Sequence, residues 1–192
     1  MKILILYGTT EGQTRKIAHF MEAILQNAGH HVTIADTATN PPAPTAYDAI
    51  LIGSSIHMHK YQSAAKHYIK KHLDELNNMP GAFFSVSLAV ASGLAEENLG
   101  VQKITNDFLE QTGWKPMMVT QIAGALKYTE YDYFKRLVMK MISKKEGGAT
   151  DTSQDYEYTD WEEVTKFVNE FLERASQSPE GTSSKPQIHP LP

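Results

Sequence analysis

Cysteine is absent from all 192 residues of the sequence. Without thiols the chain cannot form a disulfide, hold an iron–sulfur cluster through cysteine or use a thiol as a nucleophile. Any redox chemistry must therefore come from a bound organic cofactor or from a metal held by other ligands. The same absence is compatible with a cytosolic protein.

Long apolar runs and an excess of basic charge are also lacking. No window approaches the ~20 apolar residues that span a bilayer, and the apolar run before Gly8 is too short for a secretory signal. The net charge of -4 and the isoelectric point near 6.1 argue against a nucleic-acid binder, which needs a concentrated basic surface. We therefore expect a protein that is neither secreted nor integral to a membrane.

The sequence does contain five short apolar runs that alternate with amphipathic helix patterns. With 41% hydrophobic residues, the chain can build the core of one α/β domain. Alternating strands and helices predict a doubly wound parallel sheet with helices on both faces. We expect this domain over residues 1–175, with a disordered, proline-rich tail over 176–192. The predicted strands are 3–6, 31–35, 49–53, 82–86 and 117–123. A single helix is expected after the third strand, with Ala65, Tyr68, Ile69, Leu73 and Leu76 facing the core. The helix after the fourth strand packs through Val101, Ile104, Phe108 and Leu109, and a capping box at Thr159-Asp160-Trp161-Glu162 begins the last helix.

The turn over residues 7–14 lies between the first strand and the first helix. It brings three threonine hydroxyls, two glycines and the free N–H groups of a helix start together, which suits a phosphate group. The turn lacks the Lys-Ser/Thr ending of a triphosphate loop and the three-glycine dinucleotide pattern, so it favours a mononucleotide. An ordinary strand-to-helix turn with a threonine cap is the alternative. The candidate phosphate ligands are Thr9, Thr10, Glu11, Gly12, Gln13 and Thr14.

Three further loops follow the carboxyl ends of the predicted strands, at 54–59, 87–91 and 123–128. Because ligands of open parallel sheets bind at this edge, the loops at 54–59 and 87–91 are placed to bracket a flat ring. FMN has this shape, a phosphate at one end and a flat ring at the other. The candidate ring-binding residues are Ser54, Ser55, Ile56, His57, Met58, Ser87, Leu88 and Ala89.

The phosphate turn, the Gly53-Ser54-Ser55-Ile56 loop and the order of elements resemble flavodoxin-like proteins. This resemblance implies strand order 2-1-3-4-5 and FMN as the cofactor, with the residues above as its ligands. Later segments are similar to the menaquinone-dependent protoporphyrinogen IX dehydrogenases. These segments are Ala123-Gly124-Ala125-Leu126-Lys127-Tyr128, Met139-Lys140, Gly147-Gly148, Thr150-Asp151-Thr152 and Tyr158-Thr159-Asp160-Trp161.

The second resemblance implies an FMN-dependent oxidoreductase of haem biosynthesis that oxidises protoporphyrinogen IX and passes electrons to a quinone. The flavin would do the chemistry, so no side-chain nucleophile is required. An electron-carrier flavodoxin with no substrate reaction of its own is the alternative function. A flavodoxin-fold binding module that has lost FMN is a second alternative.

Acidic residues occupy positions where the resembled family differs. Glu11 lies in the phosphate turn, and we expect its side chain to face solvent. Those enzymes carry many arginines after the fourth strand and after the Ala-Gly-Ala-Leu segment. The substrate's two propionates favour cationic partners, so acidic residues weaken the substrate assignment more than the cofactor assignment. The acidic residues of these two stretches are Glu96, Glu97, Glu130 and Asp132.

His57 and His59 sit in the predicted ring-binding loop. A metal-binding pair is one interpretation, but no third ligand with motif spacing follows, and we expect no metal. A proton donor near the flavin and a surface histidine without a role are the others. His57 is the one candidate for a catalytic group, because flavin reduction moves protons as well as electrons.

Basic residues gather in one predicted helix near the end of the domain. Next to apolar neighbours they can bind an anionic membrane surface, where a lipid-soluble quinone is found. The alternative is the solvated face of a packed helix. We expect a cytoplasmic protein that is peripheral on the inner face of the cytoplasmic membrane. The residues are Lys135, Arg136, Lys140, Lys144 and Lys145.

Overall fold

The computed structural model describes residues 1–92, 94–126 and 156–177. Several sequence-based predictions fall outside these ranges. They are the basic residues Lys135, Arg136, Lys140, Lys144 and Lys145, the acidic residues Glu130 and Asp132, the Gly147-Gly148 and Thr150-Asp151-Thr152 motifs, and the tail after residue 177.

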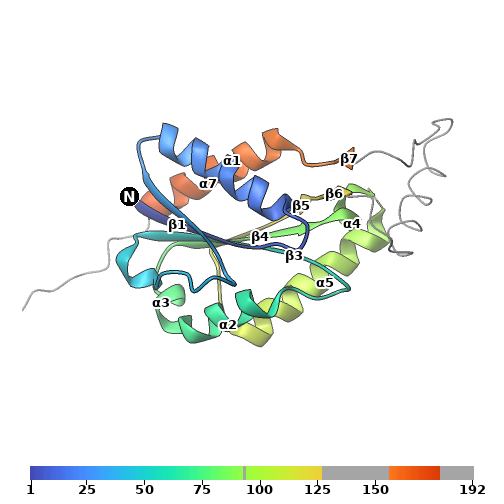
Figure 1. Cartoon of the computed structure of the whole chain (residues 1–192), viewed down its shortest axis with the longest axis horizontal. Helices are drawn as coiled ribbons and strands as arrows, with labels where there is room; N and C mark the ends of the chain where they lie inside the picture. Colours follow the sequence, from blue (N-terminus) through green and yellow to red (C-terminus); the bar gives the residue numbers. More distant parts are fainter. Residues whose placement is uncertain (93, 127–155, 178–192) are drawn as a thin grey trace, which may run out of the picture.

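Five parallel strands form the central sheet, in the order β2-β1-β3-β4-β5 (Figure 1). This arrangement confirms the predicted doubly wound sheet and its strand order. A separate antiparallel pair joins β6 to β7, with Ala125 opposite Glu157. The strands are β1 (Lys2–Gly8), β2 (His31–Asp36), β3 (Ala49–Ser55), β4 (Gly81–Ser87), β5 (Met118–Ala123), β6 (Ala125–Leu126) and β7 (Tyr156–Glu157).

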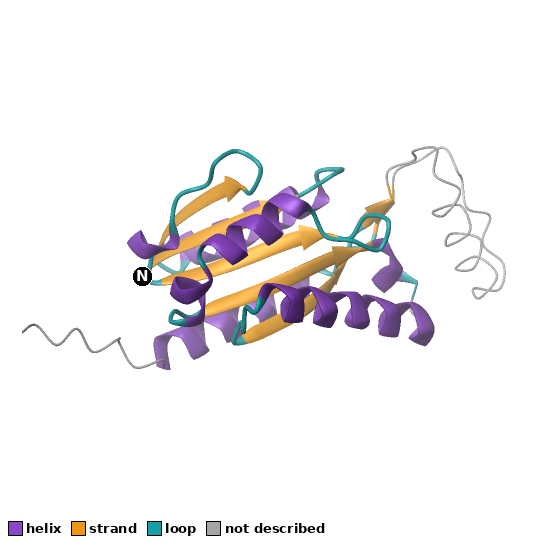
Figure 2. Ribbon diagram, turned by 90° about the horizontal axis from the view of Figure 1, so that it is seen from below, coloured by secondary structure: helices purple, strands orange, loops and turns teal. Residues whose placement is uncertain are grey.

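Helices cover both faces of the sheet. α1 and α7 lie on one face and α2, α3 and α5 on the other, while α4 caps the carboxyl end of β4 (Figures 1 and 2). The helices are α1 (Gln13–Asn27), α2 (Ser63–Lys71), α3 (Leu73–Asn77), α4 (Leu88–Ala91), α5 (Ala95–Thr112) and α7 (Trp161–Gln177), with a 3-10 turn, η1, at Pro44–Ala46. Of the helices in the described ranges, none has the length and apolar character needed to cross a membrane.

The continuous apolar runs of the central strands follow from this layering. Ile3 and Ile5 pack in the core cluster under α1 and α7, whereas Leu4 and Leu6 pack in the cluster under α2 and α5. Successive side chains of a strand point to opposite faces, so a strand covered on both sides needs apolar residues at every position. All four side chains are fully buried.

Gly53 in β3 has a steric role. A Cβ at this position would lie 2.0 Å from the ring atoms Cε2 and Cζ of Phe84. Gly53 pairs with Phe84 of β4 in the sheet register. The ring therefore occupies the space that any larger residue at position 53 would need.

Two element boundaries differ from the predictions. The single helix expected after the third strand is divided at His72, where φ is -117° and ψ is 30°, into α2 and α3. At the carboxyl end of the domain, α7 extends to Gln177, two residues into the predicted tail. The hydrophobic pattern did not reveal the division because Leu73 and Leu76 still pack inward after it.

The predicted capping box at Thr159 and Glu162 is wrong. α7 begins at Trp161, and Asp160 Oδ1 accepts hydrogen bonds from the backbone N–H groups of Glu162 (3.0 Å) and Glu163 (3.1 Å). Asp160 therefore caps the helix, since its carboxylate satisfies two N–H groups that have no partner within the helix. The hydroxyl of Thr159 makes other contacts, described below.

Candidate flavin site

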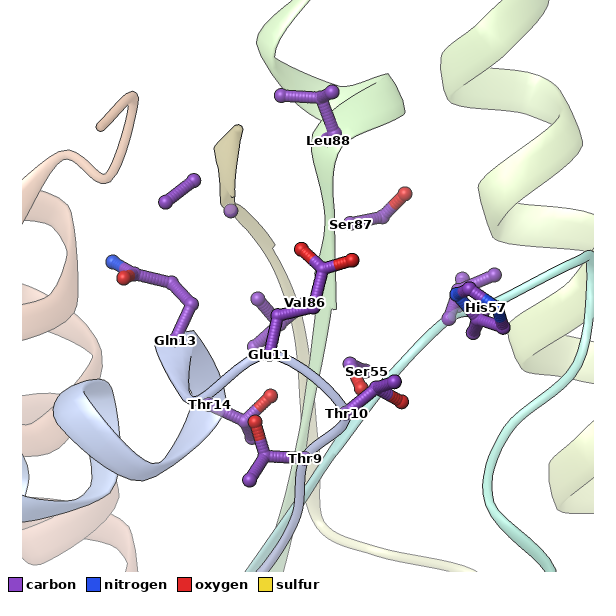
Figure 3. Close-up of a pocket in the computed structure, with 13 residues that line it drawn as sticks. Thr9, Thr10, Glu11, Gln13, Thr14, Ser55, His57, Val86, Ser87 and Leu88 are labelled. Atoms are coloured by element: carbon purple, nitrogen blue, oxygen red, sulfur yellow. The ribbon is translucent and has the colours of Figure 1, made fainter. Parts of the chain in front are cut away.

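The turn between β1 and α1 gathers hydroxyl groups around the start of the helix. Gly12 has a φ of 92°, a left-handed conformation that favours glycine, and it directs the chain into α1. Thr9 Oγ1 accepts a hydrogen bond from the Gly12 N–H (2.8 Å), which leaves the hydroxyl proton of Thr9 for another acceptor. Figure 3 shows Thr9, Thr10 and Thr14 grouped at one end of a hollow.

Buried hydroxyls at this end lack acceptors. Thr14 is fully buried, and among the described residues its Oγ1 has no hydrogen-bond partner; the same is true of the Ser55 Oγ. Both residues line the hollow. A buried hydroxyl without a partner is unfavourable, so these groups fit a ligand that accepts hydrogen bonds. Together with the first N–H groups of α1, they match a phosphate group and the polar chain attached to it.

Glu11 is only partly exposed and lines the site, whereas the prediction had its side chain facing solvent. Its side chain is half-buried and lines the hollow, and Figure 3 shows the carboxylate extending from the turn toward Val86 and Ser87. A carboxylate at this place accepts hydrogen bonds from hydroxyl groups and repels a phosphate, so it suits the ligand's polar chain better than its anionic end.

The loop after β3 contains a tight turn in an unusual conformation. The His57 N–H donates to the Lys60 carbonyl (2.9 Å) and the Lys60 N–H donates to the His57 carbonyl (3.0 Å). Between them, Met58 (φ 48°) and His59 (φ 63°) are both left-handed, which costs roughly 1–2 kcal/mol for each such residue. Backbone strain of this kind is concentrated at ligand sites. The turn exposes 77% of Met58 at the rim of the site.

Two adjoining hollows follow these loops. The first is narrow, about 50 Å³, and carries the threonines, Glu11 and Gln13. The second measures about 310 Å³ and has mainly apolar walls, with His57, His59 and Glu97 among its polar residues. Because Ile56, His57, Ser87 and Leu88 line both, the hollows form one elongated site. The apolar walls of the second hollow come from Ile56, Met58, Leu88, Ala89, Val101 and Ile104.

Side chains behind the loop hold it in place. Tyr61 donates its hydroxyl proton to Ser85 Oγ (2.7 Å) and lies 2.7 Å from Thr105 Oγ1. Burial raises the pKa of the Tyr61 phenol above its ordinary value, so the group stays protonated and able to donate. Gln62 Nε2 donates to Thr10 Oγ1 (3.1 Å), which connects this loop to the phosphate turn. Hydrogen bonds therefore connect the end of the loop after β3 both to the sheet and to the turn after β1.

β7 and the residues that follow it contact the side of α1 next to the site. Gln13 Nε2 donates to Glu157 Oε1 (3.1 Å) and to Thr159 Oγ1 (2.9 Å), and Lys16 Nζ donates to Glu157 Oε2 (2.5 Å). The hydrogen bond from Lys16 is the largest cause that holds the pKa of Glu157 below its ordinary value. The Thr159 hydroxyl in turn donates to the Ala123 carbonyl (2.8 Å).

Metal binding finds no support in the described geometry. Within residues 1–92, 94–126 and 156–177, no three side chains of metal-ligating type gather closely enough to hold an ion. His57 and His59 instead belong to the strained turn and line the second hollow.

The structure brings most of the predicted site residues to the two hollows, but not all. Ser54 is fully buried in β3, and Gly12 shapes the turn without lining either cavity. Met58 and Ala89 line only the second hollow. Sequence reasoning missed the contribution of α5, whose Val101 and Ile104 were assigned only to the core. It also missed Thr159, which is visible in the sequence only as a cap.

Comparison with known proteins agrees with this geometry. Residues 4–153 match the family model described as a flavodoxin domain. The protoporphyrinogen IX dehydrogenase [quinone] of Escherichia coli (strain K12) is 39% identical over 171 residues, which are 88% of this chain and 94% of that protein. The protein of the same name from Leishmania major is 35% identical over 175 residues, covering 88% of this chain and 74% of the relative.

Solved structures show the same fold. Oxidised flavodoxin 1 from Bacillus cereus superposes with a TM-score of 0.56 at 16% identity, covering 90% of this chain and 98% of the flavodoxin. A flavodoxin from the domain Archaea gives 0.52 at 15% identity, covering 92% and 99%. The chain therefore belongs to the flavodoxin family, which implies a flavin cofactor, and it is related over most of its length to the protoporphyrinogen IX dehydrogenase [quinone] proteins.

Proposed function

We propose that the protein is an FMN-dependent oxidoreductase that oxidises protoporphyrinogen IX to protoporphyrin IX and delivers the electrons to a quinone. The observation that carries this proposal is the junction of a polar hollow with an apolar one at the carboxyl edge of the sheet. The substrate and the acceptor are taken from the names of the relatives, which align with 88% of the chain at 39% and 35% identity.

The residues of the first hollow fit the phosphate of FMN. Thr14 and Ser55 offer buried hydroxyls that have no hydrogen-bond partner in the part of the chain that the structure describes, and the start of α1 offers backbone N–H groups. Thr9 and Thr10 accept hydrogen bonds from the protein, so their hydroxyl protons can be donated to an anion. This fit supports a phosphorylated flavin over riboflavin, which carries no phosphate.

The second hollow fits a flat ring. Leu88, Val101 and Ile104 contribute apolar side chains, and the strained turn adds Met58 at the rim. Bound in this place, FMN supplies the capacity to accept a hydride and return the electrons. Residues of the loop after β3 and of α4 line this hollow and would hold the ring, and the apolar side chains would limit the access of water. His57 lines both hollows, and we propose that it holds or moves a proton at the ring edge.

Glu96 and Glu97 have a structural account that does not require another substrate. Both lie in the first turn of α5, where acidic side chains complement the positive end of the helix dipole. Glu96 is exposed, whereas Glu97 lines the second hollow. Glu97 would repel the substrate's propionates from the second hollow, so we propose that they are directed toward solvent.

Anaerobic turnover tests the function. Protein loaded with FMN is mixed with protoporphyrinogen IX and a menaquinone analogue without oxygen, and porphyrin fluorescence is followed. We expect fluorescence to rise well above that of a mixture holding free FMN and the quinone without protein. A rate equal to this background, from protein that has bound FMN, would favour the electron-carrier alternative. Protein that binds no flavin would overturn the cofactor assignment itself.

A further inference from the structure

The hydroxyl of Thr159 connects two walls of the flavin site. It donates a hydrogen bond to the carbonyl of Ala123, the last residue of β5, at 2.8 Å. It accepts one from the side chain of Gln13, the first residue of α1, at 2.9 Å. Thr159 is 9% exposed. One buried hydroxyl thus joins the end of β5 to the start of α1, the helix that follows the phosphate turn. Gln13 and Thr159 are 146 positions apart in the sequence.

Neighbouring residues strengthen the connection. The Tyr158 N–H donates to the carbonyl of Gly124 (3.2 Å), and Gly124 itself lines the first hollow. Glu157 accepts from Gln13 and from Lys16, one turn along α1. Three consecutive residues, 157 to 159, therefore each hold the wall of the site through a different bond.

Gln13 has a different role from the one the sequence suggests. Its amide nitrogen has two N–H groups, one directed to Glu157 at the end of β7 and one to Thr159 just after it. The side-chain amide of Gln13 is therefore engaged away from the phosphate. The backbone N–H of the same residue stands at the start of α1, where no partner within the helix is available to it.

Aromatic packing holds this contact from behind. The rings of Phe20 on α1 and Trp161 on α7 lie 4.6 Å apart between centroids. Lys16 Nζ lies 5.4 Å from the centroid of the Trp161 ring. Asp160 caps α7, so the Thr159 hydroxyl is not required for the cap. The threonine is placed for the bridge alone.

We propose that Thr159 is a positioning residue of the flavin site. Building on the proposed FMN function, its hydroxyl fixes Gln13 and the first turn of α1 in the position that presents the helix N–H groups and the Thr14 hydroxyl to the FMN phosphate. Residues 157–159 thereby support the cofactor site. Its effect is directed to the phosphate end of the ligand, which riboflavin lacks.

The test compares FMN and riboflavin binding to Thr159→Val and Thr159→Ser by quenching of flavin fluorescence. Valine keeps the shape of threonine but removes the hydroxyl, so we expect FMN affinity to fall about tenfold, the effect of one hydrogen bond. Riboflavin affinity should change by less than about twofold, and serine should restore FMN binding. Thr165→Val is the matched control, because within the described ranges the Thr165 hydroxyl on α7 bonds inside its own helix, to the Trp161 carbonyl (2.8 Å).

Two results with folded Thr159→Val protein decide against the proposal. Unchanged FMN affinity in Thr159→Val, or an equal loss of FMN and riboflavin, would show a threonine with no role or a merely structural one. If Thr159→Val does not fold, Gln13→Met breaks the same bridge from its half-buried end and should cause the same selective loss of FMN. Unchanged FMN binding there would overturn the inference. Wild-type protein that binds neither flavin would overturn the cofactor proposal as well, which separates the two failures.

Discussion

Thr14 is the residue on which the phosphate assignment depends most directly. Its hydroxyl is fully buried, has no partner among the described residues and opens onto the first hollow. A hydrogen bond to a charged acceptor contributes about 1.5–3 kcal/mol. The same group contributes nothing favourable to the folded protein without ligand, because a buried hydroxyl has lost its water and gained no partner.

Thr14→Val should therefore separate binding from stability. We expect FMN affinity to fall roughly tenfold to a hundredfold, while the free energy of unfolding of the flavin-free protein stays equal or rises. Fluorescence quenching and urea unfolding measure the two quantities. Thr112→Val is the matched control, since the buried Thr112 hydroxyl donates to the Leu109 carbonyl (3.0 Å) far from the site; it should lower stability by about 1 kcal/mol and leave FMN binding unchanged. Unaltered FMN affinity in Thr14→Val would contradict the phosphate assignment.

His57 can be tested through the redox potential of the bound flavin. Because it lines both hollows, its replacement should change the environment in which the ring gains protons and electrons. We expect His57→Ala to shift the two-electron potential of bound FMN by about 30 mV or more, which is a tenfold change in the equilibrium. His67→Ala is the control, as this exposed side chain lies on α2 with its Nδ1 at 3.1 Å from the Ser63 carbonyl. Equal potentials in wild type and His57→Ala would contradict a role of His57 at the flavin ring.

At the scale of elements, the packing of β3 against β4 determines where the loop after β3 begins. Phe84 fills the space above Gly53, and Ser54 and Ser55 follow directly in the strand. The backbone of β3 can approach the ring of Phe84 only because position 53 has no side chain. The loop from Ile56 onward starts from this close packing.

Gly53→Ala should destabilise the protein, since its Cβ would lie 2.0 Å from Phe84 ring atoms inside the sheet. Overpacking of this kind costs about 1–3 kcal/mol in the free energy of unfolding. The matched substitution is Gly100→Ala in α5, where nothing lies within 4 Å of the new methyl group, and this should stabilise the helix by roughly 0.5–1 kcal/mol. Urea unfolding of the two variants measures both effects. A Gly53→Ala protein as stable as the wild type would refute the packing argument.

For the whole molecule, we propose a peripheral membrane contact through the basic residues between 135 and 145. The net charge of -4 opposes adsorption to an anionic membrane, so binding requires a local basic cluster. We expect the full chain to co-sediment with vesicles containing anionic lipid at low salt and to be released at high salt, because screening weakens these contacts. A variant with Lys135, Arg136, Lys140, Lys144 and Lys145 changed to glutamine should stay in the supernatant. Equal sedimentation of both proteins, or of neither, would contradict the proposal.

The pattern of the sequence was sufficient for the fold. Each apolar run without alternation predicted a strand buried on both faces, and Ile3 to Leu6 are divided between the two core clusters as that pattern requires. The polar residues after each run were assigned to one edge of the sheet, and Thr9, Ser55 and Ser87 do line one hollow. These features depend on which residues are buried. Burial repeats with the period of a strand or helix and can therefore be recognised in the sequence.

The tertiary structure decided which polar groups lie together and form hydrogen bonds. The sequence predicted a Glu11 facing solvent and a Thr159 capping a helix, but Glu11 lines the hollow and Thr159 bridges Gln13 and Ala123. Met58 and His59 adopt left-handed conformations that their residue types disfavour, because the two hydrogen bonds of the turn hold them there. The sequence by itself thus determined the sheet, its ligand-binding edge and the family. Hydrogen bonds between residues distant in sequence carry no periodic signal, so only the folded chain determined how the site is held together.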